Sequence, residues 1–157
     1  MALSSIVGLA ANSFTENGIP YIGNWPSLIG SDTIIVPPSA DEGDPLFISL
    51  DEAAALFQSS SVLFIDARDP EDYEYGHIKG AINIPYDYLE DMTDPRVTAI
   101  PPGQKMVIYC SGAECESSLH LGRDFQYEGY SDIFIFFGGW REWERARLPV
   151  IKGKIIE

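Results

Sequence analysis

The sequence predicts an α/β fold: a mostly parallel, five-stranded sheet with helices on both faces. Apolar runs of strand length alternate with segments of helical pattern along most of the chain, and this alternation gives a parallel sheet. The run at 62–65 is apolar at successive positions, as in a strand that is covered on both faces. A chain of 157 residues with 45% hydrophobic residues suits one domain with a substantial core.

The first 45 residues are expected to form an extended arm and linker, and residues 46–157 the folded domain. Turn-forming residues recur from Asn12 to Asp44, and Pro37–Pro45 is acidic and rich in proline, which is typical of a linker. Residues 1–11 are apolar but shorter than the ~20 residues that span a membrane. They are interpreted as a short terminal helix or, alternatively, as the remnant of a longer membrane anchor. The default location is then cytoplasmic, and the alternative is membrane-anchored.

Within the domain, local signals mark the ends of the predicted helices. Ser49 and Glu52 form a capping box before the first helix, in which each side chain bonds the other residue's free amide. Asp69 followed by Pro70 starts the next helix, and Gly129 ends a later one. The predicted strands are 46–48, 61–67, 81–84, 106–109 and 132–137. The predicted helices are 50–57, 70–75, 87–91, 118–128 and 140–147, with Gly76-His77 as the turn that closes the second.

Cys110 stands where the strand 106–109 ends and a loop of small and polar residues leads into the helix 118–128. Backbone amides in such a loop, together with the positive end of the helix dipole, stabilise an anion. The same field lowers the pKa of a cysteine, so both a thiolate and a charged adduct on it would be stabilised. Cys110 is therefore a candidate nucleophile. The alternative is a buried structural cysteine.

Two further segments directly follow predicted strands, namely Asp66-Ala67-Arg68 and Gly138-Gly139. Ligands of parallel sheets bind beyond the carboxyl ends of the strands. We therefore expect these segments to meet Cys110 at one edge of the sheet.

The composition narrows the range of partners. A formal net charge of -14 would repel the phosphates of nucleic acids and of anionic membranes, so neither is expected as a partner. Two cysteines are too few for a disulfide framework in a domain of this size. His77 and His120 do not form a metal-binding pattern with them, and no metal site is predicted.

Taken in order, these segments resemble the rhodanese-like sulfurtransferase domains. The most specific piece is the run Gly76-His77-Ile78-Lys79-Gly80-Ala81-Ile82-Asn83-Ile84-Pro85, which follows Asp66-Ala67-Arg68. The other matching pieces are Phe64-Ile65, Glu71, Tyr75, Val107-Ile108-Tyr109-Cys110, Gly129-Tyr130, Gly138-Gly139-Trp140, Trp143 and Leu148-Pro149-Val150. The resemblance covers about residues 46–153. It implies a rhodanese-like three-layer sandwich with the sheet in the middle.

The resemblance implies a catalytic role for Cys110, which would end the fourth core strand. In such enzymes the thiolate takes the outer sulfur of a donor, holds it as a persulfide among loop amides, and passes it to a nucleophilic acceptor. The implied partners are a small sulfur donor and a thiol or protein acceptor, and the chemistry needs no cofactor. The residues expected to bind the substrate are Ser111, Gly112, Ala113, Glu114, Cys115, Glu116, Ser117 and Ser118.

The loop departs from this family in two respects. It is longer than the usual sulfurtransferase loop, and it carries Glu114 and Glu116 where members that use thiosulfate typically carry arginine or lysine. A doubly negative donor such as thiosulfate is therefore expected to be disfavoured. A phosphatase on the same fold is not expected, because that chemistry requires an arginine to bind the phosphoryl oxygens at the position of Glu116.

Asp66 and Arg68 are expected to support the site through a charge-assisted pair with each other, with Glu71 or with backbone. His77 is expected to be a turn residue bonded to backbone. Trp140 and Trp143 are interpreted as aromatic residues of the core or of the sheet edge.

Cys115 has two interpretations. It is either a resolving thiol that attacks a persulfide or a sulfenate on Cys110, or a small residue that fills the longer loop. Three functions follow: a persulfide-forming sulfurtransferase, a thiol redox protein that uses Cys110 and Cys115, or a catalytically degenerate module that only binds a partner. The presence of Cys110 favours an enzyme over the third function.

Overall fold

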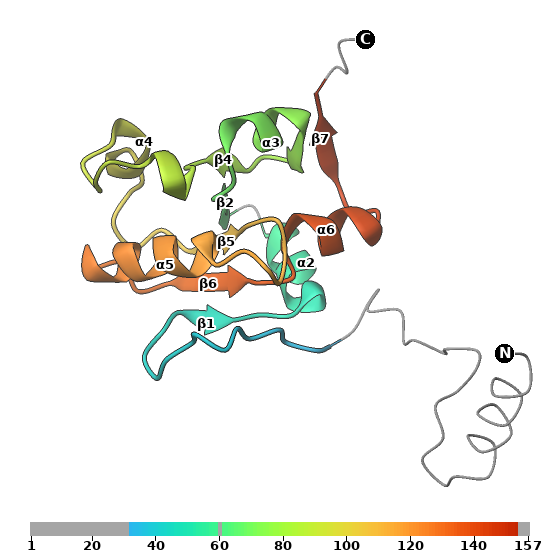
Figure 1. Cartoon of the computed structure of the whole chain (residues 1–157), viewed down its shortest axis with the longest axis horizontal. Helices are drawn as coiled ribbons and strands as arrows, with labels where there is room; N and C mark the ends of the chain where they lie inside the picture. The colour runs from blue at the N-terminus through green and yellow to red at the C-terminus, as the bar shows by residue number, and fades with distance from the viewer. Residues whose placement is uncertain (1–31, 60, 154–157) are drawn as a thin grey trace, which may run out of the picture.

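The computed structural model describes residues 32–59 and 61–153 (Figure 1). Its centre is one sheet of five parallel strands in the order β1-β6-β5-β2-β4. The strands are β1 (Leu46–Phe47), β2 (Leu63–Asp66), β4 (Ile82–Asn83), β5 (Met106–Tyr109) and β6 (Ile133–Phe136). Each lies within a predicted segment, and the predicted fold class is confirmed.

Helices cover both faces of this sheet, which makes three layers. One face packs against α5 (Ser117–Tyr127) and α4 (Pro95–Thr98), and the other against α2 (Leu50–Phe57) and α6 (Gly139–Arg145). In β5, Met106 and Ile108 belong to the core beneath α5, whereas Val107 and Tyr109 belong to the core beneath α6. Alternate side chains of a strand point to opposite faces, so a strand between two helical layers must be apolar throughout.

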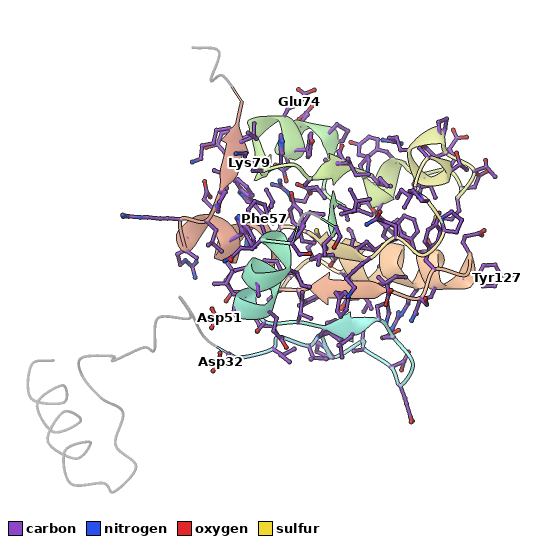
Figure 2. All side chains as sticks on the ribbon, turned by 180° about the vertical axis from the view of Figure 1, so that it is seen from behind. Asp32, Asp51, Phe57, Glu74, Lys79 and Tyr127 are labelled. Atoms are coloured by element: carbon purple, nitrogen blue, oxygen red, sulfur yellow. A yellow bond between two sulfur atoms is a disulfide. The ribbon has the colours of Figure 1, made fainter. Side chains whose placement is uncertain are left out.

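Local signals determine where several helices begin and end. Ser49 donates its amide to Glu52 Oε2 at 2.8 Å, and Glu52 donates its amide to Ser49 Oγ at 3.2 Å, so the predicted capping box is confirmed. Asp69 precedes α3 (Pro70–Tyr75), although its side chain makes no capping hydrogen bond. At the far end of α5, Tyr127 points into solvent (Figure 2), and Gly129 follows with a φ of 93°, a conformation that favours glycine.

Two local predictions are wrong. Gly76-His77 is more than a turn, because Gly76–Ile78 forms strand β3, antiparallel to β7 (Val150–Lys152). The segment 87–91 is not a helix; a 3₁₀ turn, η1 (Tyr86–Tyr88), overlaps its start. The helix α4 follows at Pro95–Thr98, where no helix was predicted. Such short strands form only through their partner, and that partner is far along the chain, so no local pattern predicts β3.

The segment 37–45, predicted as a linker, lies against α5. Arg123 holds it through three hydrogen bonds: Nε to Asp44 Oδ1 at 2.7 Å, Nη2 to Asp44 Oδ2 at 2.8 Å, and Nη2 to the carbonyl of Ser39 at 2.9 Å. Pro45 packs beside Gly122, where a Cβ would lie 3.2 Å from the proline ring. The segment is therefore fastened to the domain by charge and by packing.

Residues 1–31 lie outside the described residues, and with them the interpretation of 1–11 as a terminal helix or an anchor. In the part of the chain that the structure describes, no helix is both long enough and apolar enough to cross a membrane.

Replacing Arg123 with Gln should loosen the segment 37–45 and leave the fold intact. Gln cannot form the two charge-assisted bonds to Asp44, so the free energy of unfolding should fall by about 1 kcal/mol or less. Hydrogen exchange should quicken at the amides of Ala40 and Asp44, which are bonded within the segment. Arg96→Gln is the control, because Arg96 pairs with the nearby Asp94 and should not affect that exchange.

The same contact predicts a dependence on pH. The hydrogen bond from Arg123 lowers the pKa of Asp44, so its stabilisation is fully present above the usual aspartate pKa of about 4. It is lost as the pH falls through the lowered value, and the segment should then exchange faster. Unchanged exchange in Arg123→Gln would show that packing, such as that of Pro45 beside Gly122, holds the segment without the ion pair.

Candidate active site

Cys110 directly follows β5 and lies at the carboxyl edge of the sheet. Its side chain is almost fully covered, with 2% of the residue exposed. Strands β2 and β6 flank β5, so the residues that follow these strands reach the same edge. The amide of Ala67, after β2, donates to the carbonyl of Tyr109 at 2.9 Å.

The first turn of α6 fastens the start of the loop. The amide of Trp140 donates to the carbonyl of Cys110 at 2.8 Å, and the amide of Arg141 donates to the carbonyl of Ser111 at 3.1 Å. Gly139 adopts a φ of 63° and leaves no room for a side chain, since a Cβ there would lie 2.8 Å from the nitrogen of Gly112. The prediction that Gly138-Gly139 and Cys110 meet at one edge is confirmed.

A disulfide joins Cys110 to Cys115 across the loop, with the two Cα atoms 6.1 Å apart. The amide of Cys115 donates to the carbonyl of Gly112 at 2.9 Å, which closes a turn between the two cysteines. Cys115 is half-buried, and its sulfur lies 3.5 Å from the hydroxyl oxygen of Ser117 in the first turn of α5. Both sulfurs therefore lie near the N-terminal end of α5.

This end of α5 supplies hydrogen-bond donors. The first amides of a helix have no partner within the helix and carry partial positive charge. Glu116 occupies the N-cap position, but its side chain does not cap the helix. The hydroxyl of Ser118 is fully buried and has no hydrogen-bond partner within the described residues. A buried hydroxyl without a partner costs free energy, so the first turn of α5 contains an unsatisfied hydrogen-bonding group.

Each of the two loop glutamates has polar side chains beside it. Glu114 is 90% exposed, and its carboxylate lies 3.7 Å from Arg141 Nη1. Glu116 accepts a hydrogen bond from the Ser39 hydroxyl at 2.7 Å and lies 3.7 Å from His120 Nε2. The charge of Glu114 is thus partly balanced by Arg141 and screened by solvent, which weakens the repulsion expected for an anionic donor.

A cavity of about 190 Å³ opens beside the loop. Its lining residues are Ile35, Gly112, Ala113, Glu114, Gly138, Arg141, Glu142 and Arg145. Burial raises the pKa of the Glu142 carboxyl, so this acid is more easily protonated than an exposed glutamate. The cavity offers a small ligand both charged and apolar contacts beside residues 112–114, the part of the loop between the two cysteines.

Four of these residues, Arg141, Glu142, Arg145 and Ile35, were not among the predicted site residues. Arg141 and Arg145 lie four positions apart and so share one face of α6, which is a signal that the sequence does contain. Glu142 follows from the same helix once its start at Gly139 is known. Ile35 comes from the arm, and no local pattern connects it with the loop.

Asp66 and Arg68 form the expected pair, deep inside the protein. Arg68 Nη2 donates to Asp66 Oδ2 at 2.6 Å and Nε donates to Asp66 Oδ1 at 2.9 Å, with both side chains almost fully covered. The same Nη2 donates to the carbonyl of Gly76 at 2.6 Å, and the guanidinium lies 5.0 Å from the ring centre of Trp140. The pair therefore connects β2 to β3 and α6.

The remaining predicted residues have structural contacts. His77 lies in β3 with Nδ1 2.8 Å from the carbonyl oxygen of Tyr73, and the two rings stack at 3.8 Å. Trp140 and Trp143 are buried in the core between α6 and the sheet. Across residues 32–59 and 61–153, no group of three or more His, Cys, Asp or Glu side chains is arranged to hold a metal ion.

Residues 49–146 match the family model described as "Rhodanese-like domain". One curated relative is the HTH-type transcriptional regulator Rv0324 of Mycobacterium tuberculosis, 34% identical over 99 residues, which are 61% of this chain and 40% of the relative. Another is the tRNA uridine(34) hydroxylase of Erwinia tasmaniensis, 32% identical over 116 residues, which are 69% of this chain and 32% of the relative. The chain thus spans less than half the length of these relatives.

Solved structures with the same fold include EanB in complex with hercynine. The match has a TM-score of 0.59 and 26% identity, and covers 69% of this chain and 28% of EanB. A further EanB structure holds ergothioneine covalently linked with a persulfide cysteine, with a TM-score of 0.58 and 25% identity over 69% of this chain and 28% of EanB. The BH2092 protein of Bacillus halodurans matches with a TM-score of 0.55 at 22% identity, over 64% of this chain and 71% of its own, and this likeness concerns the fold alone.

Proposed function

Since the chain belongs to the rhodanese-like domain family, we propose that it is a sulfurtransferase that carries sulfur as a persulfide on Cys110. One observation carries this proposal. Cys110 directly follows β5 beside the N-terminal turn of α5, where the hydroxyl of Ser118 is buried without a partner in the described residues. Helix amides and a free hydroxyl suit a thiolate and a persulfide equally well.

The chemistry begins once the disulfide is reduced, because only a free thiolate can attack. The Cys110 thiolate attacks the outer sulfur of a donor, the donor's remaining part leaves with the electron pair, and a persulfide forms on Cys110. The loop 111–118, with the Ser118 hydroxyl, holds the terminal sulfur. An acceptor thiolate then attacks that sulfur and leaves Cys110 as the thiolate again.

The cavity beside the loop supports a small donor or acceptor. Its lining combines Arg141 and Arg145 with Glu114 and Glu142, so a ligand that carries both charges, or none, fits better than a doubly negative one. We therefore expect organic persulfides to be better donors than thiosulfate.

The disulfide supports a second candidate, a thiol redox protein that cycles between Cys110-Cys115 and the dithiol. The two functions differ in what the reduced protein gains. A sulfurtransferase gains one sulfur atom from a donor, whereas a thiol redox protein loses two hydrogens to an oxidant and takes up no sulfur.

The decisive variant is Cys110→Ser, which nearly preserves the side-chain volume. The reduced protein is incubated separately with thiosulfate, an organic persulfide and an oxidant, and its intact mass is measured. We expect Cys110→Ser to take up no sulfur while its melting temperature stays close to that of the wild type, and Cys115→Ser, the matched control, to take up one sulfur atom. Uptake of one sulfur atom by Cys110→Ser and none by Cys115→Ser would assign the nucleophile to Cys115 instead.

A further inference from the structure

Cys115 is positioned to act on a sulfur that Cys110 carries. These are the two cysteines of the whole chain, and they are bonded to each other with Cα atoms 6.1 Å apart. Cys110 is almost fully covered, whereas Cys115 is half-buried and precedes the first turn of α5. The two thiols thus differ in access to solvent, which fits different roles in one reaction.

The path of the loop does not depend on the sulfur–sulfur bond. The carbonyls of Cys110 and Ser111 accept hydrogen bonds from the first turn of α6, and the carbonyl of Gly112 accepts one from the amide of Cys115. At its far end, Glu116 accepts a hydrogen bond from Ser39. None of these contacts involves a sulfur atom, so they remain available to the reduced loop and keep the two thiols close together.

We propose that Cys115 discharges the persulfide on Cys110 and releases the carried sulfur as hydrosulfide; the step rests on the proposed function, which supplies the persulfide. The Cys115 thiolate attacks Sγ of Cys110, and a bond forms between the two cysteine sulfurs. The bond from Cys110 Sγ to the terminal sulfur breaks, and that sulfur leaves with the electron pair as hydrosulfide. The carried sulfur is reduced and the two cysteines are oxidised, so the electrons balance.

The product of this step is the disulfide seen in the structure, and a dithiol must reduce it before the next cycle. The dithiol attacks Cys115, because Cys115 is the less buried of the two residues. Cys110 then leaves as the thiolate beside the N-terminal end of α5, where the helix stabilises it. The second thiol of the reductant frees Cys115. In sum, a sulfane sulfur and a dithiol become hydrosulfide and a disulfide, so the co-substrate is a dithiol reductant.

A single-turnover experiment tests this step. The protein is reduced, and the reductant is then removed in the absence of oxygen. One equivalent of glutathione persulfide is added. The released hydrosulfide is trapped with a bimane reagent, and the intact mass of the protein is measured. The wild type should release about one equivalent of hydrosulfide and lose two hydrogens. Cys115→Ser should keep the added sulfur and release hydrosulfide at least about tenfold more slowly, because it lacks a nucleophile within the loop. The Cys110→Ser variant gives the background rate at which the donor alone releases hydrosulfide.

The outcomes separate this inference from the proposed function. If Cys115→Ser takes up sulfur but the wild type keeps its persulfide equally long, the discharge step is wrong and the sulfurtransferase stands. If no protein takes up sulfur, both are wrong. A Cys115→Ala variant with an unchanged melting temperature guards against a folding defect. With several equivalents of glutathione persulfide, the wild type should stop after about one equivalent of hydrosulfide until dithiothreitol is added; continued release without a dithiol, above that of Cys110→Ser, would overturn the inference.

Discussion

Replacing Asp66 with Asn should lower the free energy of unfolding by about 3–5 kcal/mol, because it leaves the guanidinium of Arg68 buried without a countercharge. Asn has nearly the same shape as Asp, so the lost free energy of unfolding would come from the missing charge and not from a cavity. Urea unfolding measures it as a fall in the midpoint at an unchanged slope. Because the pair connects β2 to β3 and α6, the edge that carries Cys110 should also loosen.

The chain contains a matched control for this variant. Asp94 and Arg96 repeat the same contacts at the same spacing: the Arg96 amide and Nε donate to Asp94 Oδ1 at 2.8 and 2.9 Å, and Nη2 donates to Oδ2 at 2.7 Å. That pair lies at the protein surface, with the two side chains 22% and 42% exposed, and the hydrogen bonds from Arg96 lower the pKa of Asp94 to about 2. Asp94→Asn should therefore destabilise the protein much less than Asp66→Asn. Equal losses would show that water reaches Arg68.

A double variant checks the physical reason. Arg68→Met removes the buried cation, so Asp66→Asn combined with Arg68→Met should be more stable than Asp66→Asn alone. A double variant that loses the sum of both single losses would show that hydrogen bonds to neighbouring elements, such as the one to the Gly76 carbonyl, outweigh the charge pairing.

Much of the domain could be predicted because its signals are local. The apolar runs of β2, β5 and β6 are covered on both faces by helices, so their composition alone identifies them. The capping box of Ser49 and Glu52 fixes the start of α2 within four residues of chain. Asp66 and Arg68 pair across a single intervening residue, and the contact between Cys110 and Cys115 is also within one short loop.

The parts that could not be predicted depend on contacts between distant segments. The strand β3 exists because β7 pairs with it, and neither is long enough to be recognised alone. The segment 37–45 has the composition of a linker, and only Arg123, far along the chain, shows that it is attached. Asp66 and Arg68 are deeply buried because α6 and β3 cover them. Their spacing in the sequence predicts the ion pair but not its burial.

A substitution at Gly139, at the same edge of the sheet, should have a second large effect, on the reactivity of Cys110. Its φ of 63° is costly for any other residue, and a Cβ would collide with the carbonyl oxygen of Cys110 and lie 2.8 Å from the nitrogen of Gly112. Gly139→Ala should therefore push the cysteine loop away from α6 and weaken the hydrogen bond from the Trp140 amide to Cys110. A displacement of the order of 1 Å is enough to slow a reaction about 100-fold, so we expect that loss in the rate of sulfur uptake by Cys110.

Gly129→Ala is the control that separates the collision from the backbone strain. Gly129 also has a positive φ, 93°, but nothing lies within 4 Å of the position its Cβ would take, and it follows the far end of α5. In both variants the free energy of unfolding should fall by about 1–2 kcal/mol, because alanine is strained at a positive φ. The rate of sulfur uptake should fall in Gly139→Ala alone. Sulfur uptake is timed by intact mass at a temperature where both variants are folded, with alkylation of reduced Cys110 as a second measure of its position. If Gly139→Ala takes up sulfur as fast as Gly129→Ala, the contact between α6 and the loop does not position Cys110 for reaction, and the loop must be held from the α5 side.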